Sequence, residues 1–321
     1  MRDRAVALAR SGLRRLSART GAALDRASPR FRDFVTRGLT TFIFHDITDE
    51  PSRFQRETSS YTRSAEFRAQ IEWIMQRFTV VSPEELPQLT TGVADRPFPH
   101  NAALITFDDA WAGIPQVGLP ILHEYGCPAV WFVNMGTILG DPDVAVVAHY
   151  EQIVLKRAPD PNRSYTIQSA DEHLETLRLR YSDNDAFGQY QGPIASMSDV
   201  RESAEVPGVW FGSHLLHHWN LGQIDEGLYR ASIQANREAL APFACSLPIL
   251  ATPFGFAGER ALRAPRDFGY RVIFVGTCQQ ERQVSWDDLV VDRVFLPTGE
   301  PAMRSWWYAT HRKRIFGRYA S

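Results

Sequence analysis

The sequence predicts an α/β protein built on a closed barrel of parallel strands, and three observations lead to this prediction. Short apolar segments alternate with segments of helical periodicity along most of the chain, and repeated βα units imply a parallel sheet. Roughly six to eight such units within about 260 residues favour a closed barrel over an open sheet. The composition, 44% hydrophobic and 22% charged, is that of a folded globular protein.

The first half of the predicted barrel is recognised from apolar runs and one clear helical face. Phe67, Ile71, Ile74 and Phe78 share one side of a helix. The predicted elements are, in order, a strand at 40–45, a helix at 66–78, a strand at 80–81, a helix that begins with a Ser cap at 82, a strand at 102–107, a helix near 115–125 and a strand at 129–133.

The second half continues the alternation after an interruption. We predict a strand at 209–212, a helix at 225–240, a strand at 249–252, a helix at 258–268 and strands at 271–275 and 290–296. The interval from about 139 to 206 breaks the rhythm with a charged helix at 171–180 and a polar run at 181–192. It is interpreted as an insertion on one rim, either a lid or substrate wall, or an elaboration without contact to the site.

The ends of the chain differ in charge from its body. Residues 1–37 hold ten Arg against three Asp, and residues 304–321 hold five basic residues and no acid, so the body between them is acidic. An acidic body repels phosphate backbones and argues against a nucleic-acid partner. The predicted organisation is a basic amphipathic extension at 1–37, a barrel at 38–300 and a basic aromatic tail at 301–321.

Both ends suit peripheral contact with an anionic membrane. Alternatively, they are solvated basic extensions, or helices that pack on the body or on a second subunit. The longest uninterrupted apolar run near the start, residues 5–9, is shorter than a signal peptide needs. The expectation is therefore a cytoplasmic protein, with any membrane contact at the inner face.

The three cysteines form no close pair, which argues against a disulfide framework or a Cys-based zinc site.

Two groups of side chains follow predicted strands and carry chemistry. Asp108 and Asp109 end a buried strand, where two adjacent carboxylates are costly unless a cation compensates them. His214 and His218, four residues apart, face the same way if the segment forms a helical turn and can then share one ion. Each group alone is weak, and a strand-ending turn with exposed Asp is the plainer interpretation of the first. Together they are stronger, because the carboxyl ends of barrel strands converge on one face.

The ordered motifs Thr106-Phe107-Asp108-Asp109, Gly212-Ser213-His214 with His218, and Pro253-Phe254-Gly255 resemble those of the NodB-type polysaccharide deacetylases, carbohydrate esterase family 4. The resemblance runs from about Thr41 to Pro297 and is carried further by the Phe44-His45 strand end. It implies a distorted (β/α) barrel of the polysaccharide deacetylase type with a rim insertion. The implied activity is removal of acetyl groups from N-acetylated sugars, that is, hydrolysis of C–N bonds other than peptide bonds.

The resemblance also implies roles for individual residues. Asp108 would be the general base, and Asp109, His214 and His218 would hold one divalent metal ion. The backbone N–H of Phe254 would donate to the oxyanion. Zinc is the first expectation for the metal, with cobalt, nickel, iron or manganese as alternatives suited to His and Asp ligands.

The sequence departs from the family pattern at two positions that bear on mechanism. The Arg that often precedes the oxyanion loop and orients the base is absent from residues 247–252, and we find no C-terminal Leu-x-His segment to supply the general acid. His45 and His217 are the candidates for that acid, although a structural role for either is equally compatible with the sequence. Trp111 and Trp219 are expected to line the substrate site, with His45 beside them.

The leading hypothesis is a metal-dependent deacetylase of an N-acetylated sugar, glycan or lipid-linked glycan precursor. A catalytically weak or inactive barrel that binds glycan is the first alternative, supported by the two departures. An O-acetyl esterase or another amidohydrolase is the second.

Overall fold

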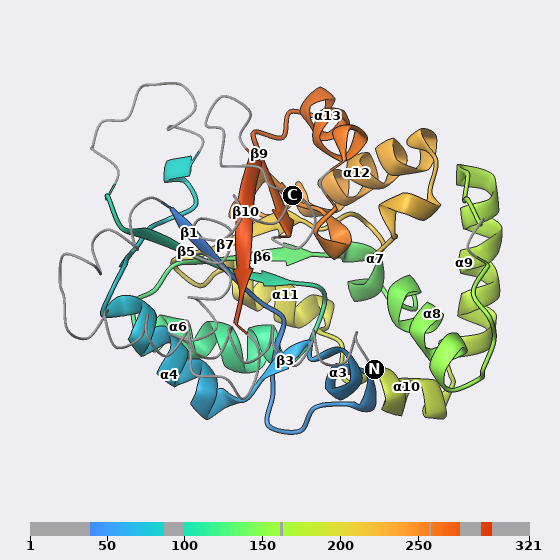
Figure 1. Cartoon of the computed structure of the whole chain (residues 1–321), viewed down its shortest axis with the longest axis horizontal. Coiled ribbons are helices and arrows are strands. Elements are labelled where there is room, and N and C mark those ends of the chain that lie inside the picture. The colour runs from blue at the N-terminus through green and yellow to red at the C-terminus, as the bar shows by residue number, and fades with distance from the viewer. Residues whose placement is uncertain (1–38, 87–98, 161–162, 257, 277–289, 297–321) are drawn as a thin grey trace, which may run out of the picture.

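The computed structural model describes residues 39–86, 99–160, 163–256, 258–276 and 290–296 and shows a closed barrel of parallel strands (Figure 1). The barrel strands are β1 (Thr40–Phe44), β5 (Ala102–Asp108), β6 (Ala129–Val133), β7 (Val209–Ser213), β8 (Ser246–Ala251), β9 (Val272–Gly276) and β10 (Val290–Phe295). Hydrogen bonding follows the order β1-β10-β9-β8-β7-β6-β5, and β5 pairs again with β1. The predicted barrel is therefore confirmed, since this last pairing closes the sheet.

Three short strands lie outside the closed ring. β4 (Thr79–Val80) pairs with the beginning of β5, whereas β2 (Asp46–Ile47) and β3 (Tyr61–Thr62) pair only with each other within the described residues. The described helices are α3 (Arg53–Thr58), α4 (Ser64–Met75), α6 (Leu119–Glu124), α7 (Met135–Ile138), α8 (Val144–Ile153), α9 (Ile167–Tyr181), α10 (Asp185–Gln191), α11 (Met197–Ala204), α12 (Glu226–Leu240) and α13 (Glu259–Asp267), with short helical turns η1 (Ile114–Gly118), η2 (Leu221–Gln223) and η3 (Pro253–Gly255).

Strand alternation divides the apolar side chains into two cores. On β5, Ala103, Ile105 and Phe107 belong to the large core shared with the surrounding helices, whereas Leu104 belongs to the smaller core inside the barrel. Successive side chains of a strand point to opposite faces. Asp108 therefore shares the interior face with Leu104, which directs its carboxylate into the barrel at the end of the strand.

The segment between β6 and β7 is mostly helical. It contains α7, α8, α9, α10 and α11, of which the sequence predicted only a part of α9. α8 escaped prediction because its apolar residues lack a strong helical face, and α10 because its polar residues resemble a loop. Figure 1 shows α8, α9 and α10 on one side of the barrel, with α9 outermost.

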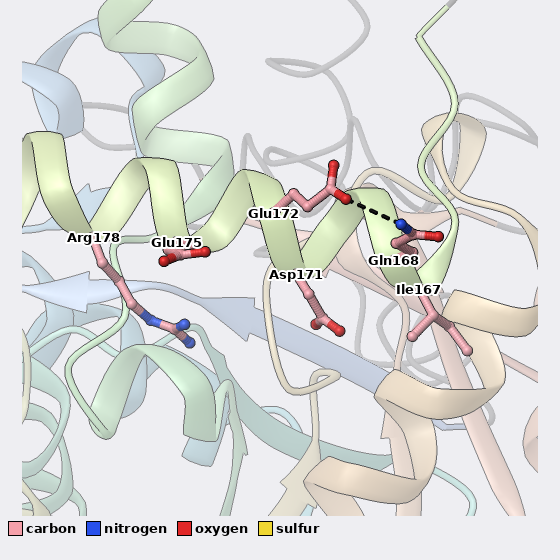
Figure 2. Close-up of a pocket in the computed structure, with 6 residues that line it drawn as sticks. All are labelled: Ile167, Gln168, Asp171, Glu172, Glu175 and Arg178. Carbon is pink, nitrogen blue, oxygen red and sulfur yellow. Dashed lines mark hydrogen bonds between the residues drawn. The ribbon is translucent and has the colours of Figure 1, made fainter.

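A hollow of about 720 Å³ lies along α9 (Figure 2). All six side chains that line it come from this one helix, and three of them are carboxylates: Ile167, Gln168, Asp171, Glu172, Glu175 and Arg178. Arg178 also pairs with Asp141, at 2.5 Å from its Nε to Oδ1. The hollow is therefore separate from the Asp108-Asp109 and histidine motifs, and Arg178 links it to Asp141.

The predicted elements agree with the described ones except at their ends. The helix expected to begin at Ser82 is described only as far as Leu86. The two basic ends, 1–37 and 301–321, lie outside the described residues, so their proposed membrane contact and the division of the chain into three parts stay predictions. Among the described residues, no helix is both long and apolar enough to cross a membrane.

One prediction concerns Asn236 of α12, because its side chain forms hydrogen bonds at the ends of both β6 and β7. Its buried amide donates to Val133 O (2.9 Å) and Ser213 Oγ (2.8 Å) and accepts from Met135 N (3.0 Å). We expect Asn236→Ala to lower the free energy of unfolding by about 2–4 kcal/mol, because buried polar partners lose their hydrogen bonds.

Chemical denaturation monitored by circular dichroism measures this loss. The exposed Gln234 of the same helix provides the control, because Gln234→Ala removes only a surface contact to Glu238 and should change stability by less than about 0.5 kcal/mol. Equal effects of the two substitutions would contradict the proposed role of Asn236.

Candidate active site

The two neighbouring carboxylates are separated by an abrupt change of backbone direction. Asp108 is the last residue of β5, and Asp109 adopts the left-handed conformation with φ 75°. Two indole N–H groups hold Asp109 in this strained state: Trp131 Nε1 donates to its carbonyl oxygen at 2.7 Å, and Trp111 Nε1 donates to Oδ2 at 3.0 Å. The turn therefore aims the two side chains at different partners.

Asp108 is paired with an arginine that the sequence did not reveal. Arg293, on β10, donates from Nη1 to Oδ1 at 2.5 Å and from Nη2 to Oδ2 at 2.7 Å. Burial would raise the pKa of the Asp108 carboxyl, but the charges of Arg293 and His214 outweigh burial and lower it to about 2. Asp108 is therefore ionised throughout the physiological pH range.

Arg293 contacts the candidate base, as would the Arg that the family resemblance led us to expect at residues 247–252 and that is absent there. The only sequence signal for Arg293 is its position in the strand predicted at 290–296, two residues after Val291. In the structure, Val291 lies in the core inside the barrel. The same alternation directs Arg293 inward. The barrel brings β10 beside β1, and β1 beside β5, so that residues 185 positions apart meet.

The histidine motif forms a loop and not the helical turn expected from its spacing. Residues 214–220 have no helix, and Leu215 adopts a left-handed conformation with φ 66°. Asn134 donates to the carbonyl oxygens of His214 and Leu215. Gly136 N donates to Leu216 O at 2.7 Å, and a side chain on Gly136 would collide with His217. The loop is therefore shaped by the residues that follow β6.

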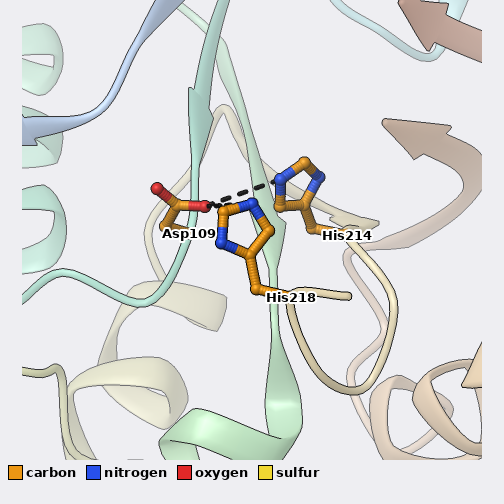
Figure 3. A group of neighbouring side chains, drawn as sticks. All are labelled: Asp109, His214 and His218. Carbon is orange, nitrogen blue, oxygen red and sulfur yellow. Dashed lines mark ion pairs between the residues drawn. The ribbon is translucent and has the colours of Figure 1, made fainter. Parts of the chain in front are cut away.

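This loop brings both imidazoles to Asp109 (Figure 3). His214 Nε2 lies 3.5 Å and His218 Nε2 3.6 Å from Asp109 Oδ1. His214 Nε2 also lies 3.8 Å from Asp108 Oδ2. The base candidate and the three ligand candidates therefore meet at the carboxyl ends of β5 and β7.

The two imidazoles have opposite tendencies to bind a proton. Burial lowers the pKa of His214, and its Nδ1 lies 2.9 Å from Ala251 O, an acceptor that fixes the proton on Nδ1 and leaves Nε2 as a lone pair. Burial also disfavours the charge of His218, but Asp109 and Asp143 outweigh it and raise its pKa to about 9.

Asp109, His214 and His218 have the donor set and spacing of a metal site. Their ligand atoms all lie within 4.8 Å of one another. Asp109 Oδ1 is buried, and no hydrogen-bond partner for it is found among the described residues. A buried carboxylate oxygen without a donor is costly, and a cation between it and the two Nε2 atoms would compensate it. The residues therefore fit a divalent ion with imidazole and carboxylate ligands.

The other candidate residues, His45, His217 and Phe254, differ in how they lie relative to the cluster. His45 follows β1 and interacts electrostatically with Asp108, whereas His217 turns away and its Nε2 lies 2.8 Å from Asp141. Phe254 has φ 57° and stacks on His218, with ring centroids 4.9 Å apart, and 51% of its surface is exposed. The exposed face of the site is therefore on the side of His218 and Phe254.

Trp111 and Trp219 do not have free ring faces for a sugar. They are only 2% and 3% exposed. Trp111 stacks on Phe54 and donates to Asp109, and Trp219 packs on Tyr165. Their burial argues against the expected stacking on substrate and gives Trp111 a positioning role instead.

The family follows from a match over more than half of the chain. A family model described as polysaccharide deacetylase matches residues 95–273. The chain belongs to the polysaccharide deacetylase family. It is therefore a hydrolase that acts on C–N bonds other than peptide bonds. The matched residues of this deacetylase include both carboxylates, both imidazoles and Phe254.

Solved structures of low sequence identity share the fold. The deacetylase PplD of Streptococcus pyogenes, solved in complex with acetate, is 15% identical with a TM-score of 0.55 over 83% of this chain and 95% of its own. IcaB from Ammonifex degensii is 17% identical with a TM-score of 0.58, over 85% and 97%. A de-N-acetylase from Aggregatibacter actinomycetemcomitans is 14% identical with a TM-score of 0.55, over 84% and 99%. No curated protein matches the sequence.

The raised pKa of His218 makes metal affinity depend on pH. In the metal-free deacetylase His218 is protonated below about pH 9, and an imidazole must lose that proton before it can bind a metal. We expect the dissociation constant for Zn²⁺ to rise about tenfold for each pH unit lowered between about pH 8 and about pH 6. Calorimetric titration in buffers of different ionisation enthalpy measures both the affinity and the released proton; an affinity that is constant over this range would contradict the assignment.

The Asp108–Arg293 pair gives a second prediction, on stability. We expect Arg293→Met to lower the free energy of unfolding by about 3–5 kcal/mol, because it leaves a buried carboxylate without its partner. The double variant with Asp108→Asn should lose less than the sum of the two single variants, by more than about 1 kcal/mol. Denaturant titrations of the four proteins measure the coupling, and strictly additive losses would show that the pair is not coupled.

Proposed function

We propose that this deacetylase is metal-dependent and removes N-acetyl groups from a sugar, a glycan or a lipid-linked glycan precursor. The observation that carries the proposal is the meeting of an ionised, arginine-held Asp108 with the Asp109, His214 and His218 cluster at one end of the barrel. Zinc is the first expectation for the ion, and the same ligands accept cobalt, nickel, iron or manganese.

Asp109, His214 and His218 would hold the ion, which when bound supplies Lewis acidity that makes a water molecule and an acetamide carbonyl more reactive at neutral pH. Asp109 brings one negative charge and His214 a neutral imidazole whose Nδ1 is committed to Ala251 O. His218 contributes its Nε2 after losing the proton that its raised pKa holds.

Asp108 would act as the general base. The two hydrogen bonds from Arg293 fix the plane of its carboxylate, and its lowered pKa keeps it in the ionised form that a base requires, at the cost of weaker basicity. The carboxylate lies next to the cluster of candidate ligands, because Asp108 Oδ2 is 3.8 Å from His214 Nε2. Arg293 also weakens the case for an inactive glycan-binding barrel, which depended in part on the missing arginine.

Two further groups complete the proposed reaction. The backbone N–H of Phe254 would stabilise the oxyanion, and the stacking of its ring on His218 supports this by placing the residue beside the cluster. His45 would give a proton to the leaving amine. It follows β1 and interacts electrostatically with Asp108, which places it near the reacting group. His217 is a poorer candidate because Asp141 binds its Nε2.

The substrate proposal is tested by acetate release. We expect N-acetylated sugar oligomers to yield acetate, and Asp108→Asn to lower kcat by about a hundredfold or more while the metal content stays at one ion per chain, because this residue moves a proton and is not a proposed ligand. An enzymatic acetate assay with elemental analysis of the same samples measures both quantities.

The outcomes separate the remaining candidates. Metal loss in His214→Ala, together with full metal content in Asp108→Asn, supports the assigned division between ligands and base. Unchanged activity in Asp108→Asn refutes the base. Acetate release from O-acetyl but not N-acetyl substrates would select the esterase alternative instead.

A further inference from the structure

The loop between α7 and α8 places one carboxylate on each of two adjacent histidines. Asp141 Oδ2 lies 2.8 Å from His217 Nε2, and Asp143 Oδ2 lies 3.7 Å from His218 Nδ1. The loop between α7 and α8 therefore contacts the loop of residues 214–220, which carries the candidate ligands and is called the ligand loop below. Neither aspartate belongs to the motifs that carry the family resemblance.

Asp143 is held in one orientation by the helix that it caps. It is 3% exposed, and its Oδ1 accepts from Ala145 N at 2.8 Å and Val146 N at 3.1 Å at the start of α8. These two hydrogen bonds commit one carboxylate oxygen to the helix. The other oxygen, Oδ2, is left facing His218.

The ring of His218 consequently lies between two carboxylates. Its Nε2 faces Asp109 Oδ1 at 3.6 Å, and its Nδ1 faces Asp143 Oδ2 at 3.7 Å. The other ligand candidate is arranged alike, because His214 Nδ1 faces Ala251 O. Each imidazole thus presents Nε2 to the cluster and Nδ1 to a fixed acceptor.

We propose that Asp143 is a positioning residue for the metal centre: it keeps the Nδ1 proton of His218 and so turns the Nε2 lone pair toward Asp109. Carboxylates that accept the second N–H of a metal-binding imidazole orient it and raise its affinity for the ion. The inference rests on the metal site of the proposed function. It makes the segment between β6 and β7 a part of that site, which resolves the open question whether this insertion contacts it.

A plain capping role for Asp143 is the competing explanation, and Asp143→Asn separates the two. Asparagine is as good a cap as aspartate. Its carbonyl oxygen must stay on the helix N–H groups, however, so its NH₂ group is the one that faces His218 Nδ1. Two donors then oppose each other, and the acceptor that orients the ring is lost while the cap is kept.

Asp225 offers a matched control. It caps α12 through a hydrogen bond from Leu228 N at 2.7 Å and is absent from the described cluster of ligand candidates. Asp225→Asn therefore makes the same chemical change at a helix start without changing the surroundings of His218.

The experiment measures Zn²⁺ affinity by competition with a chromophoric chelator, and the visible absorption of the Co²⁺-loaded full chain. We expect Asp143→Asn to weaken Zn²⁺ binding about 10- to 100-fold and to shift the Co²⁺ bands, with Asp225→Asn unchanged in both. Above about pH 9, where His218 is neutral, the thermal midpoints of the two metal-free variants should lie close together, since both retain their caps.

Each result bears on one claim. If the wild-type protein binds neither ion, the proposed function fails. If it binds them and Asp143→Asn binds within about twofold of it with the same Co²⁺ spectrum, the positioning role is overturned. Should Asp143→Asn unfold at a much lower temperature than Asp225→Asn, the same titration of Asp143→Ser, measured where all variants are folded, decides: an affinity equal to wild type then leaves Asp143 as a cap alone.

Discussion

A guanidinium inside the barrel allows the candidate active site to contain an ionised carboxylate with almost no contact with water. Asp108 is 3% exposed and Arg293 2%. Without the arginine, burial would favour the neutral acid, which cannot accept a proton. With it, the carboxylate is charged and its plane is fixed. The closing of the sheet through β1 is what brings the two residues together, so the chemistry depends directly on the barrel.

Backbone strain is gathered around the same site. Asp109, Leu215 and Phe254 are three of the five described residues other than glycine with positive φ, a conformation that costs about 1 kcal/mol or more for an ordinary side chain. These three turns lie at a candidate ligand (Asp109), in the loop that carries the candidate ligands His214 and His218 (Leu215), and at the proposed oxyanion donor (Phe254). The hydrogen bonds of Trp111, Trp131 and Asn134 hold two of these turns in place.

The surroundings of the histidine loop come from a part of the chain that the sequence left undefined. Asn134, Gly136, Asp141 and Asp143 all follow β6, and each contacts the loop. Arg178 of α9 in turn binds Asp141. The insertion is therefore connected to the site through a short series of polar contacts.

The sequence by itself determined the strands of the barrel, several of the helices that follow them, and the identity of Asp108, Asp109, His214 and His218 as a group. These are local properties, since apolar periodicity and strand ends can be recognised within a few residues. Tertiary structure alone decided what each of them faces. Arg293 reaches Asp108 from a strand 185 positions away, and Asp143 reaches His218 from another loop, because barrel closure joins segments that no local pattern connects. It also covered Trp111 and Trp219, since the burial of a side chain depends on neighbours that come from elsewhere in the chain.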